Sequence, residues 1–188
     1  MSRSATARIL VAFFAAVLSF LSVSALEARA LDLENTLYLD LKDGRVVIEL
    51  RPDLAPGHVA RIKELARQGF YDGVVFHRVI EGFMAQGGDP TGTGAGGSGK
   101  KLKAEFSAEP HVRGTLSMAR TNDPNSADSQ FFICFGPTPF LDGKYTVWGK
   151  VVEGMDFVDK IKKGDAARNG IVSDPDKIVK MQVAADAK

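Results

Sequence analysis

The sequence predicts a mainly-β protein, a closed antiparallel barrel with two helices. Many short apolar runs, each long enough for one strand, are separated by turns rich in glycine, proline and aspartate. Only two segments have the three- and four-residue apolar spacing of a helix. Many strands with few helices are typical of a barrel, whose closure removes the exposed edges of the sheet.

A hairpin is predicted to open the fold. Residues 35–41 alternate apolar and polar side chains, as in a strand with one buried face. Asp43 and Gly44 form a tight-turn signal, and residues 46–50 continue as the return strand. The two strands are therefore expected to pair antiparallel.

Two helices are predicted. The first begins at Pro56 and ends at Gly69, where a glycine favours a left-handed C-terminal cap. Its apolar face consists of Val59, Ile62, Leu65 and Ala66. The second helix follows Gly154 and ends at Gly164, and its apolar stripe consists of Met155, Val158 and Ile161. Both stripes indicate packing against the core rather than binding sites.

The remaining strands are short apolar runs between turns. They are predicted at residues 74–79, 114–119, 130–135, 145–151 and 177–183. Because neither an internal repeat nor an interdomain linker is present, these elements are expected to form a single domain.

Residues 1–30 are predicted to be a secretory signal peptide. Arg3 and Arg8 form a basic start, residues 9–26 are almost entirely apolar, and residues 28–30 (Ala-Arg-Ala) form a small-residue cleavage site. Cleavage after Ala30 would leave residues 31–188 as the mature domain. The alternative is an uncleaved membrane anchor, because the apolar run is close to the roughly 18 to 20 residues that span a bilayer.

The charges of the chain are balanced. The 188 residues include 24 basic and 23 acidic ones, and residues 1–30 hold three arginines and one glutamate, so residues 31–188 carry a formal net charge of about −1. This balance argues against an electrostatic nucleic-acid surface. The sequence gives no sign of oligomerisation, and a monomer is expected.

A glycine-rich stretch at residues 87–99, GGDPTGTGAGGSG, formally contains G-x-G-x-x-G and nearly matches a phosphate-binding loop. Such a loop needs a following helix whose free amide groups face the anion. The residues that follow, LKAEFSAEP, have no helical apolar stripe, and Lys101 stands where the loop needs serine or threonine. A nucleotide-binding enzyme that depends on Lys100 is thus a weak alternative, and a flexible surface loop beside a substrate groove is favoured.

Metal and nucleophile chemistry is not indicated. His58, His77 and His111 are not spaced from one another, or from Cys134, as zinc ligands are. Cys134 is the only cysteine, so no intrachain disulfide can form. It lies in the apolar run FFICF and is expected to be buried as a small hydrophobic residue.

Two segments some forty residues apart look like the halves of one active site. They are residues 76–89, FHRVIEGFMAQGGD, and residues 129–145, SQFFICFGPTPFLDGKY. Together with LSMAR, NSADSQFFICF, FLDGKYTVWGKVVEGMD and the two helices, they resemble the cyclophilins, a family of peptidyl-prolyl cis/trans isomerases, over about residues 36–183. The resemblance implies an eight-stranded antiparallel barrel closed at each end by a helix. It also implies proline-containing polypeptide substrates and a reaction without nucleophile, metal or cofactor.

The resemblance also assigns roles to single residues. Arg78 matches the catalytic arginine, and Gln86 matches the polar residue that orients the arginine or the substrate. Phe83, Met84, Phe132 and Leu141 match the apolar pocket that grips the proline ring. The other substrate-binding residues implied are Ala119, Arg120, Gln130, Phe140 and Tyr145. Taken alone, Phe132 and Met84 would equally well be residues of the hydrophobic core, and Arg78 would be a surface charge.

Three positions depart from the best-known family pattern. Phe140 stands where many eukaryotic members have tryptophan, Tyr145 where they have histidine, and Arg120 where they have asparagine. Loss of the indole removes a hydrogen-bond donor and apolar area, so isomerase activity with weak cyclosporin sensitivity is expected. An extra residue near Asn122 and Asp123 also alters the loop beside Thr121.

A signal peptide on such a domain predicts an enzyme of the periplasm that assists the folding of exported proteins at slow proline steps. With an uncleaved segment, the enzyme would instead be anchored to the inner membrane and face the periplasm. The rival class of function is a binding module, a proline-peptide clamp or holdase without turnover, which would tolerate loss of Arg78.

Overall fold

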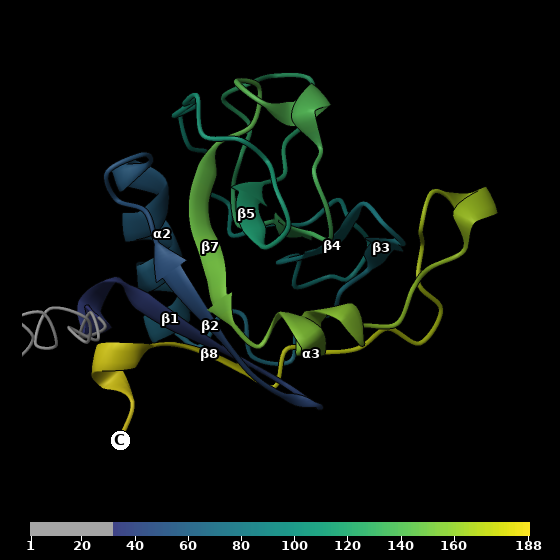
Figure 1. Cartoon of the computed structure of the whole chain (residues 1–188), viewed down its shortest axis with the longest axis horizontal. Helices are drawn as coiled ribbons and strands as arrows, with labels where there is room; N and C mark the ends of the chain where they lie inside the picture. Colours follow the sequence, from purple (N-terminus) through teal and green to yellow (C-terminus); the bar gives the residue numbers. More distant parts are fainter. Residues whose placement is uncertain (1–31) are drawn as a thin grey trace, which may run out of the picture. The chain divides into compact units, whose positions relative to one another are not determined.

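The structure is a computed structural model that describes residues 32–188. Eight strands form one antiparallel sheet in the order β3-β4-β6-β5-β7-β2-β1-β8 (Figure 1). The strands are β1 (Thr36–Leu41), β2 (Gly44–Leu50), β3 (Arg78–Ile80), β4 (Met84–Gly87), β5 (Thr115–Met118), β6 (Phe131–Cys134), β7 (Val147–Glu153) and β8 (Lys180–Val183). The predicted signal peptide lies outside the described residues.

The sheet is an open half-barrel, so the prediction of a closed barrel is wrong. Its edge strands, β3 and β8, do not pair with each other. The seam, the gap between the β3 side and the β8 side of the sheet, is spanned by two isolated bridges, Val75 with Lys177 and Arg78 with Ile171, and by single backbone bonds such as Phe76 N–H to the Asp176 carbonyl. Pro175, which has no N–H, and the left-handed Asp174 precede this segment. A regular ladder cannot extend through such residues.

The predicted hairpin is present, and β1 pairs with β2 in a register that joins Leu41 to Gly44. The other predicted strands are found in shorter or shifted form. Strand β4 was not predicted from the residue pattern, because its four residues MAQG run directly into the glycine-rich stretch and show no clean alternation.

Helix α2 (Pro56–Arg67) matches the first predicted helix. Pro56 is its first residue, the four predicted apolar positions are buried, and Gly69 is left-handed with φ +66°. The residue before the helix, Ala55, offers no side-chain cap. Instead, the Glu105 carboxylate accepts the backbone N–H groups of Gly57 and His58, both at 3.0 Å, and so satisfies two free amides at the helix start. The helix packs against β7 and β8.

Helix α3 (Met155–Asp159) is shorter than predicted. The prediction continued to Gly164, but the α-helical bonding gives way to three-residue turns at Lys160 and Ile161, and the Gly164 N–H then pairs with the Val79 carbonyl at the edge strand β3. Helix α3 packs against β2. There a Cβ on Gly44 would lie only 2.5 Å from the Phe157 ring, so the glycine of the hairpin is needed for this close approach.

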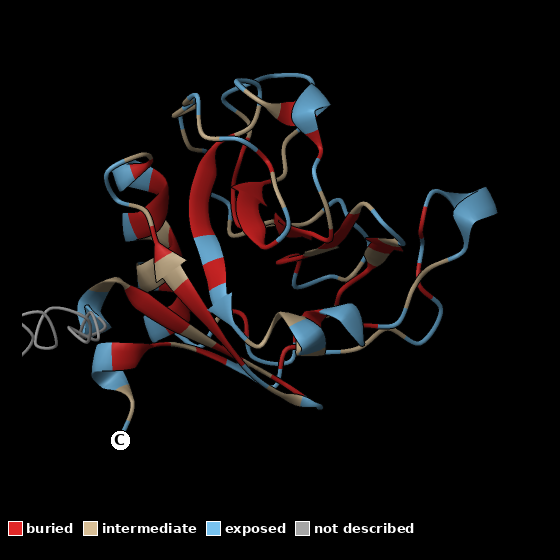
Figure 2. Ribbon diagram, in the orientation of Figure 1, coloured by how far each residue is buried: buried red, intermediate tan, exposed pale blue. Residues whose placement is uncertain are grey.

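Burial follows the strands of the sheet and the inner side of α2 (Figure 2). Strand β6 divides the interior into two parts, because successive side chains of a strand point to opposite faces. Phe131 and Ile133 belong to the large core cluster. Phe132 and Cys134 belong to a second cluster with Met84 and Leu141.

Within residues 32–188, no helix has both the length and the apolar character required to cross a membrane.

Candidate active site

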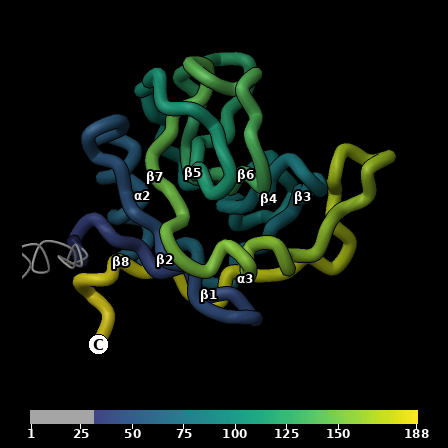
Figure 3. Tube along the Cα trace, in the orientation of Figure 1, coloured from purple at the N-terminus to yellow at the C-terminus, as the bar shows by residue number. Residues whose placement is uncertain are grey.

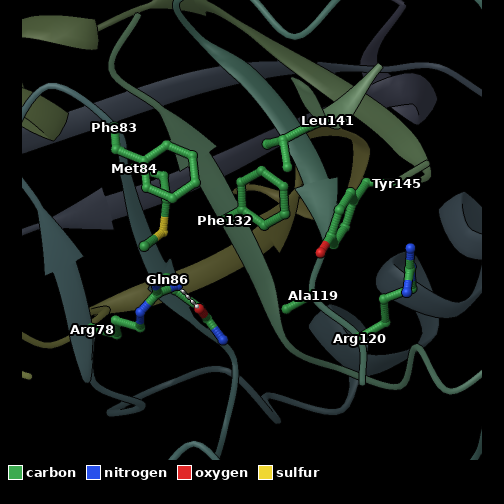
Figure 4. Close-up of a pocket in the computed structure, with 9 residues that line it drawn as sticks. All are labelled: Arg78, Phe83, Met84, Gln86, Ala119, Arg120, Phe132, Leu141 and Tyr145. Carbon is green, nitrogen blue, oxygen red and sulfur yellow. Dashed lines mark hydrogen bonds between the residues drawn. The ribbon is translucent and has the colours of Figure 1, made fainter. Parts of the chain in front are cut away.

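The second cluster borders a hollow with a volume of about 110 Å³, shown in Figure 4. The hollow is lined by nine of the eleven residues that the sequence singles out: Arg78, Phe83, Met84, Gln86, Ala119, Arg120, Phe132, Leu141 and Tyr145. The two others lie beside it. Gln130 is hydrogen-bonded to Gln86, and Phe140 is 60 % exposed with its ring 5.5 Å from that of Phe83.

The floor of the hollow is apolar, and the Phe132 ring is its centre (Figure 4). The Tyr145 ring meets it edge-on at a centroid distance of 5.9 Å, and the His111 ring stacks on it at 6.2 Å. His111 is fixed through Nδ1 by Asp142 Oδ1 at 2.9 Å and through Nε2 by Ser117 Oγ at 3.1 Å. This buried histidine therefore supports Phe132.

Arg78 stands at the polar side of the hollow and is held from two sides. Its Nη1 donates to Gln86 Oε1 at 3.1 Å, since the two residues are register partners on β3 and β4. Its Nε and Nη2 donate to the backbone carbonyl and Oδ1 of Asn169, both at 3.0 Å. Burial lowers the pKa of Arg78 below its usual value, although the guanidinium remains charged.

The Asn169 contact comes from a segment far along the chain. Residues 160–179 loop out beside β3 before entering β8 (Figures 1 and 3), and Ile171 forms an isolated bridge with Arg78. Asn169 is left-handed with φ +55°, a conformation that asparagine tolerates better than most residues. Sequence reasoning missed Asn169. The Asn-Gly pair signals a turn, but not which side chain the turn will meet.

A relay of amide side chains links Arg78 to the glycine-rich stretch. Gln86 Nε2 donates to Gln130 Oε1 at 3.0 Å, and Gln130 Nε2 donates to the carbonyls of Gly94 and Gly96 at 2.9 and 2.8 Å. Gln86 and Gln130 thus orient the arginine and the loop together.

The glycine-rich stretch closes around the Asp89 carboxylate. This fully buried group accepts the backbone N–H groups of Thr91, Thr93, Gly94 and Gly96. Amides that a phosphate loop would direct at a bound anion are therefore directed at a side chain of the same loop. This geometry disfavours the nucleotide-binding alternative.

Replacing Asp89 with asparagine is expected to lower the free energy of unfolding by about 2 kcal/mol at pH 7. Burial opposes ionisation of Asp89, but hydrogen bonds from Thr91 and from the Gly94 and Gly96 amides outweigh it and lower its pKa to about 2. As the pH falls, Asp89 is protonated in the unfolded chain before it is protonated in the folded one. The contribution of its carboxylate to the free energy of unfolding is therefore full above about pH 4 and is lost as the pH falls toward 2.

Urea unfolding of the wild type and Asp89→Asn at pH 7 and pH 3 checks this expectation. The exposed Asp43→Asn in the β1–β2 turn is the matched control. A loss of unfolding free energy in Asp89→Asn that is equally large at pH 7 and pH 3 would contradict the role of the ionised carboxylate.

Arg120 lies over the Tyr145 ring, with the guanidinium carbon 4.5 Å from the ring centroid. Its Nε and Nη2 donate to the Lys144 carbonyl at 3.1 and 2.8 Å, and its Nη1 donates to the Thr121 carbonyl at 2.8 Å. The side chain is thus fixed at the rim of the hollow by neutral acceptors.

Cys134 lies behind the floor of the hollow and is fully buried. Burial raises its pKa to about 11. The thiol is therefore protonated at neutral pH and serves as packing.

Comparisons with known proteins found a matching family model and similar chains. Residues 36–183 match the family model described as cyclophilin type peptidyl-prolyl cis-trans isomerase/CLD. The chain is 58 % identical over 190 residues to the "Probable peptidyl-prolyl cis-trans isomerase" of Brucella suis, covering 94 % of this chain and 97 % of the relative. It is 47 % identical over 137 residues to peptidyl-prolyl cis-trans isomerase B of Bacillus subtilis, covering 71 % and 95 %.

Solved structures show the same similarity. Cyclophilin AquaCyp293 from Hirschia baltica aligns with a TM-score of 0.76 and 32 % identity, over 85 % of this chain and 77 % of that one. A Cryptosporidium parvum cyclophilin type peptidyl-prolyl cis-trans isomerase, crystallised in the presence of the dipeptide Ala-Pro, aligns with a TM-score of 0.72 and 30 % identity, over 79 % and 98 %.

Proposed function

Because this chain belongs to the cyclophilin-type peptidyl-prolyl cis-trans isomerases, we propose that its small hollow holds a proline ring while Arg78 stabilises the twisted peptide bond. The observation that carries this assignment is the position of Arg78. A charged fork, anchored by Gln86 and Asn169, borders an apolar hollow that has room for one small ring.

The reaction requires that amide resonance be weakened. An X-Pro bond prefers trans by only about 0.5 to 1 kcal/mol, but its rotational barrier is roughly 18 to 20 kcal/mol. As the bond twists, the lone pair of the prolyl nitrogen leaves conjugation and can accept a hydrogen bond. Arg78 would donate that bond, and since the planar amide offers no such acceptor, the interaction favours the transition state over the ground state.

One charge-assisted hydrogen bond contributes about 1.5 to 3 kcal/mol, which corresponds to roughly one or two decades of rate. The rest of the rate enhancement would come from desolvation and from holding the ring against Phe83, Met84, Phe132 and Leu141. The other half of the amide is then free to turn. No covalent intermediate is required.

Isomerisation of a short X-Pro peptide by residues 31–188 tests the proposed function. Acceleration that depends on protein concentration supports an isomerase. Binding of the peptide in the hollow without acceleration would instead favour the non-catalytic proline clamp.

We further propose that the enzyme is exported to the periplasm and assists exported chains at slow proline steps. The support is the charge pattern of residues 1–30 and their Ala-Arg-Ala ending. Cell fractionation followed by N-terminal sequencing tests the location, and a periplasmic protein beginning at Leu31 is expected. Recovery of the full chain in the inner membrane would favour the anchored form.

The folding role has a separate test. Refolding of an exported protein that is limited by proline isomerisation should be faster with the enzyme present. An unchanged refolding rate would refute the folding role while leaving the peptide activity intact.

A further inference from the structure

The arginines of the described chain fall into two groups. Residues 32–188 contain eight arginines, and six of them form ion pairs with carboxylates: Arg45, Arg51, Arg61, Arg67, Arg113 and Arg168. Within the same residues, the two that line the hollow, Arg78 and Arg120, have no carboxylate partner and donate to carbonyl and amide oxygens.

The same two arginines also border a second, larger hollow. It has a volume of about 540 Å³ and adjoins the first, sharing Arg78, Gln86 and Arg120 with it. Thr93, Asn169 and Ile171 are among its other lining residues. Neither hollow is lined by an aspartate or a glutamate. A peptide whose proline ring occupies the small hollow would have a flanking residue beside two positive charges.

Both guanidinium groups retain donors for a ligand. A guanidinium has five N–H groups. Three donors of Arg78 are engaged by Asn169 and Gln86, and Arg120 makes four bonds, to the carbonyls of Lys144, Thr121 and Asn122. Both arginines are partly exposed, so an incoming carboxylate would not have to displace a buried ion pair. Nε and Nη2 of both arginines already donate to protein oxygens, so a carboxylate would meet the positive charge and the remaining Nη donors.

We propose that this site selects proline peptides that carry a carboxylate side chain next to the proline, and that Arg120 is the residue that determines this specificity. The proposal rests on the proposed function, because it assumes that the proline ring sits in the small hollow. Arg120 is fixed over Tyr145 and lines both hollows, so its charge would lie beside the residue that flanks the proline.

Matched peptides that differ only in charge test the proposal. Glutamate, glutamine or lysine is placed directly before or directly after the proline, and kcat/KM is measured for each. For at least one of the two positions, the wild type is expected to favour glutamate over glutamine by about two- to fivefold, the range of a partly exposed ion pair. The preference should shrink at high ionic strength, and lysine should be disfavoured.

Three variants separate charge from packing. Arg120→Gln should bring the glutamate-to-glutamine ratio close to one, whereas Arg120→Lys, which retains the charge, should keep most of it. Arg45→Gln is the matched control, because Arg45 also lies over a tyrosine ring, that of Tyr38 at 4.4 Å, but pairs with Asp40 in the β1–β2 hairpin. Arg45→Gln should leave the glutamate-to-glutamine ratio of kcat/KM unchanged.

The outcomes distinguish this proposal from the proposed function. Equal kcat/KM for glutamate and glutamine at both positions, or a ratio that survives Arg120→Gln, overturns the charge selection while acceleration of the glutamine peptides keeps the isomerase. Peptide affinities from NMR titration report the same preference without turnover. If no peptide is accelerated but glutamate peptides bind more tightly, the isomerase function fails and the charge selection stands.

Discussion

Arg78→Ala is expected to lower kcat/KM for X-Pro isomerisation by at least tenfold and by up to about 100-fold. Arg78 would supply one charge-assisted hydrogen bond to the twisted amide, and such a bond contributes about 1.5 to 3 kcal/mol. Peptide affinity should be largely kept, because the apolar floor around Phe132 remains. The loss then falls on kcat, as expected for an interaction made only in the transition state.

Two comparisons make this result specific to the guanidinium. Arg78→Lys keeps a positive charge but cannot donate to Asn169 and Gln86 with one planar fork, so its activity should recover only in part. Arg168→Ala removes an arginine from the same loop that carries Asn169, and it should leave kcat/KM within about twofold. An Arg78→Ala enzyme with wild-type kcat would contradict the catalytic role and favour the proline clamp.

Phe131→Ala is expected to lower the free energy of unfolding by about 3 to 5 kcal/mol. Phe131 is fully buried, and its ring meets Tyr71 and Trp148 edge-on at centroid distances of 5.7 Å each. Truncation therefore leaves a cavity in the large core and removes two aromatic contacts. Since single domains are stable by only about 5 to 15 kcal/mol, denaturant unfolding should show a large shift of the midpoint.

Phe132→Ala is the matched variant, one residue along β6. Its ring forms the floor of the hollow, so truncation enlarges an existing open space and should cost less stability than Phe131→Ala. It should instead lower kcat/KM by about tenfold or more, because the proline ring loses its main contact. We expect one face of β6 to serve stability and the other to serve catalysis. This expectation would be refuted if folded Phe131→Ala lost as much activity as Phe132→Ala.

Local patterns in the sequence predicted much of the fold. Alternation in β1, the turn signal at Gly44 and the cap at Gly69 are properties of neighbouring residues, and the structure has all three. The closure of the sheet was predicted wrongly, because it depends on how two distant segments meet. There Pro175 and the left-handed Asp174 leave only isolated bridges.

In the candidate site, too, some features could be predicted from the sequence and others depend on tertiary structure. Its predicted residues came from matched motifs, and nine of them line one hollow. The residues that hold these side chains in place could not be predicted from the motifs. Asn169 lies ninety-one positions from Arg78, and His111 reaches Phe132 from another loop. Asp89 is part of a motif, but its role depends on a loop that folds back onto its carboxylate. Such contacts are set by tertiary structure.

The seam has a consequence for the dynamics of the enzyme. Arg78 is on the three-residue edge strand β3, and its anchor Asn169 is on a loop attached by few backbone bonds, including Val79 N–H to Gly170 and Gly164 N–H to Val79. Segments held in this way open at a smaller free energy than the whole domain. Partial unfolding of β3 and the loop that carries Asn169 would release the Arg78 guanidinium while the large core stays intact. Catalysis would then cease before the protein denatures, and hydrogen-bonded amides along the seam would exchange faster than those of the large core.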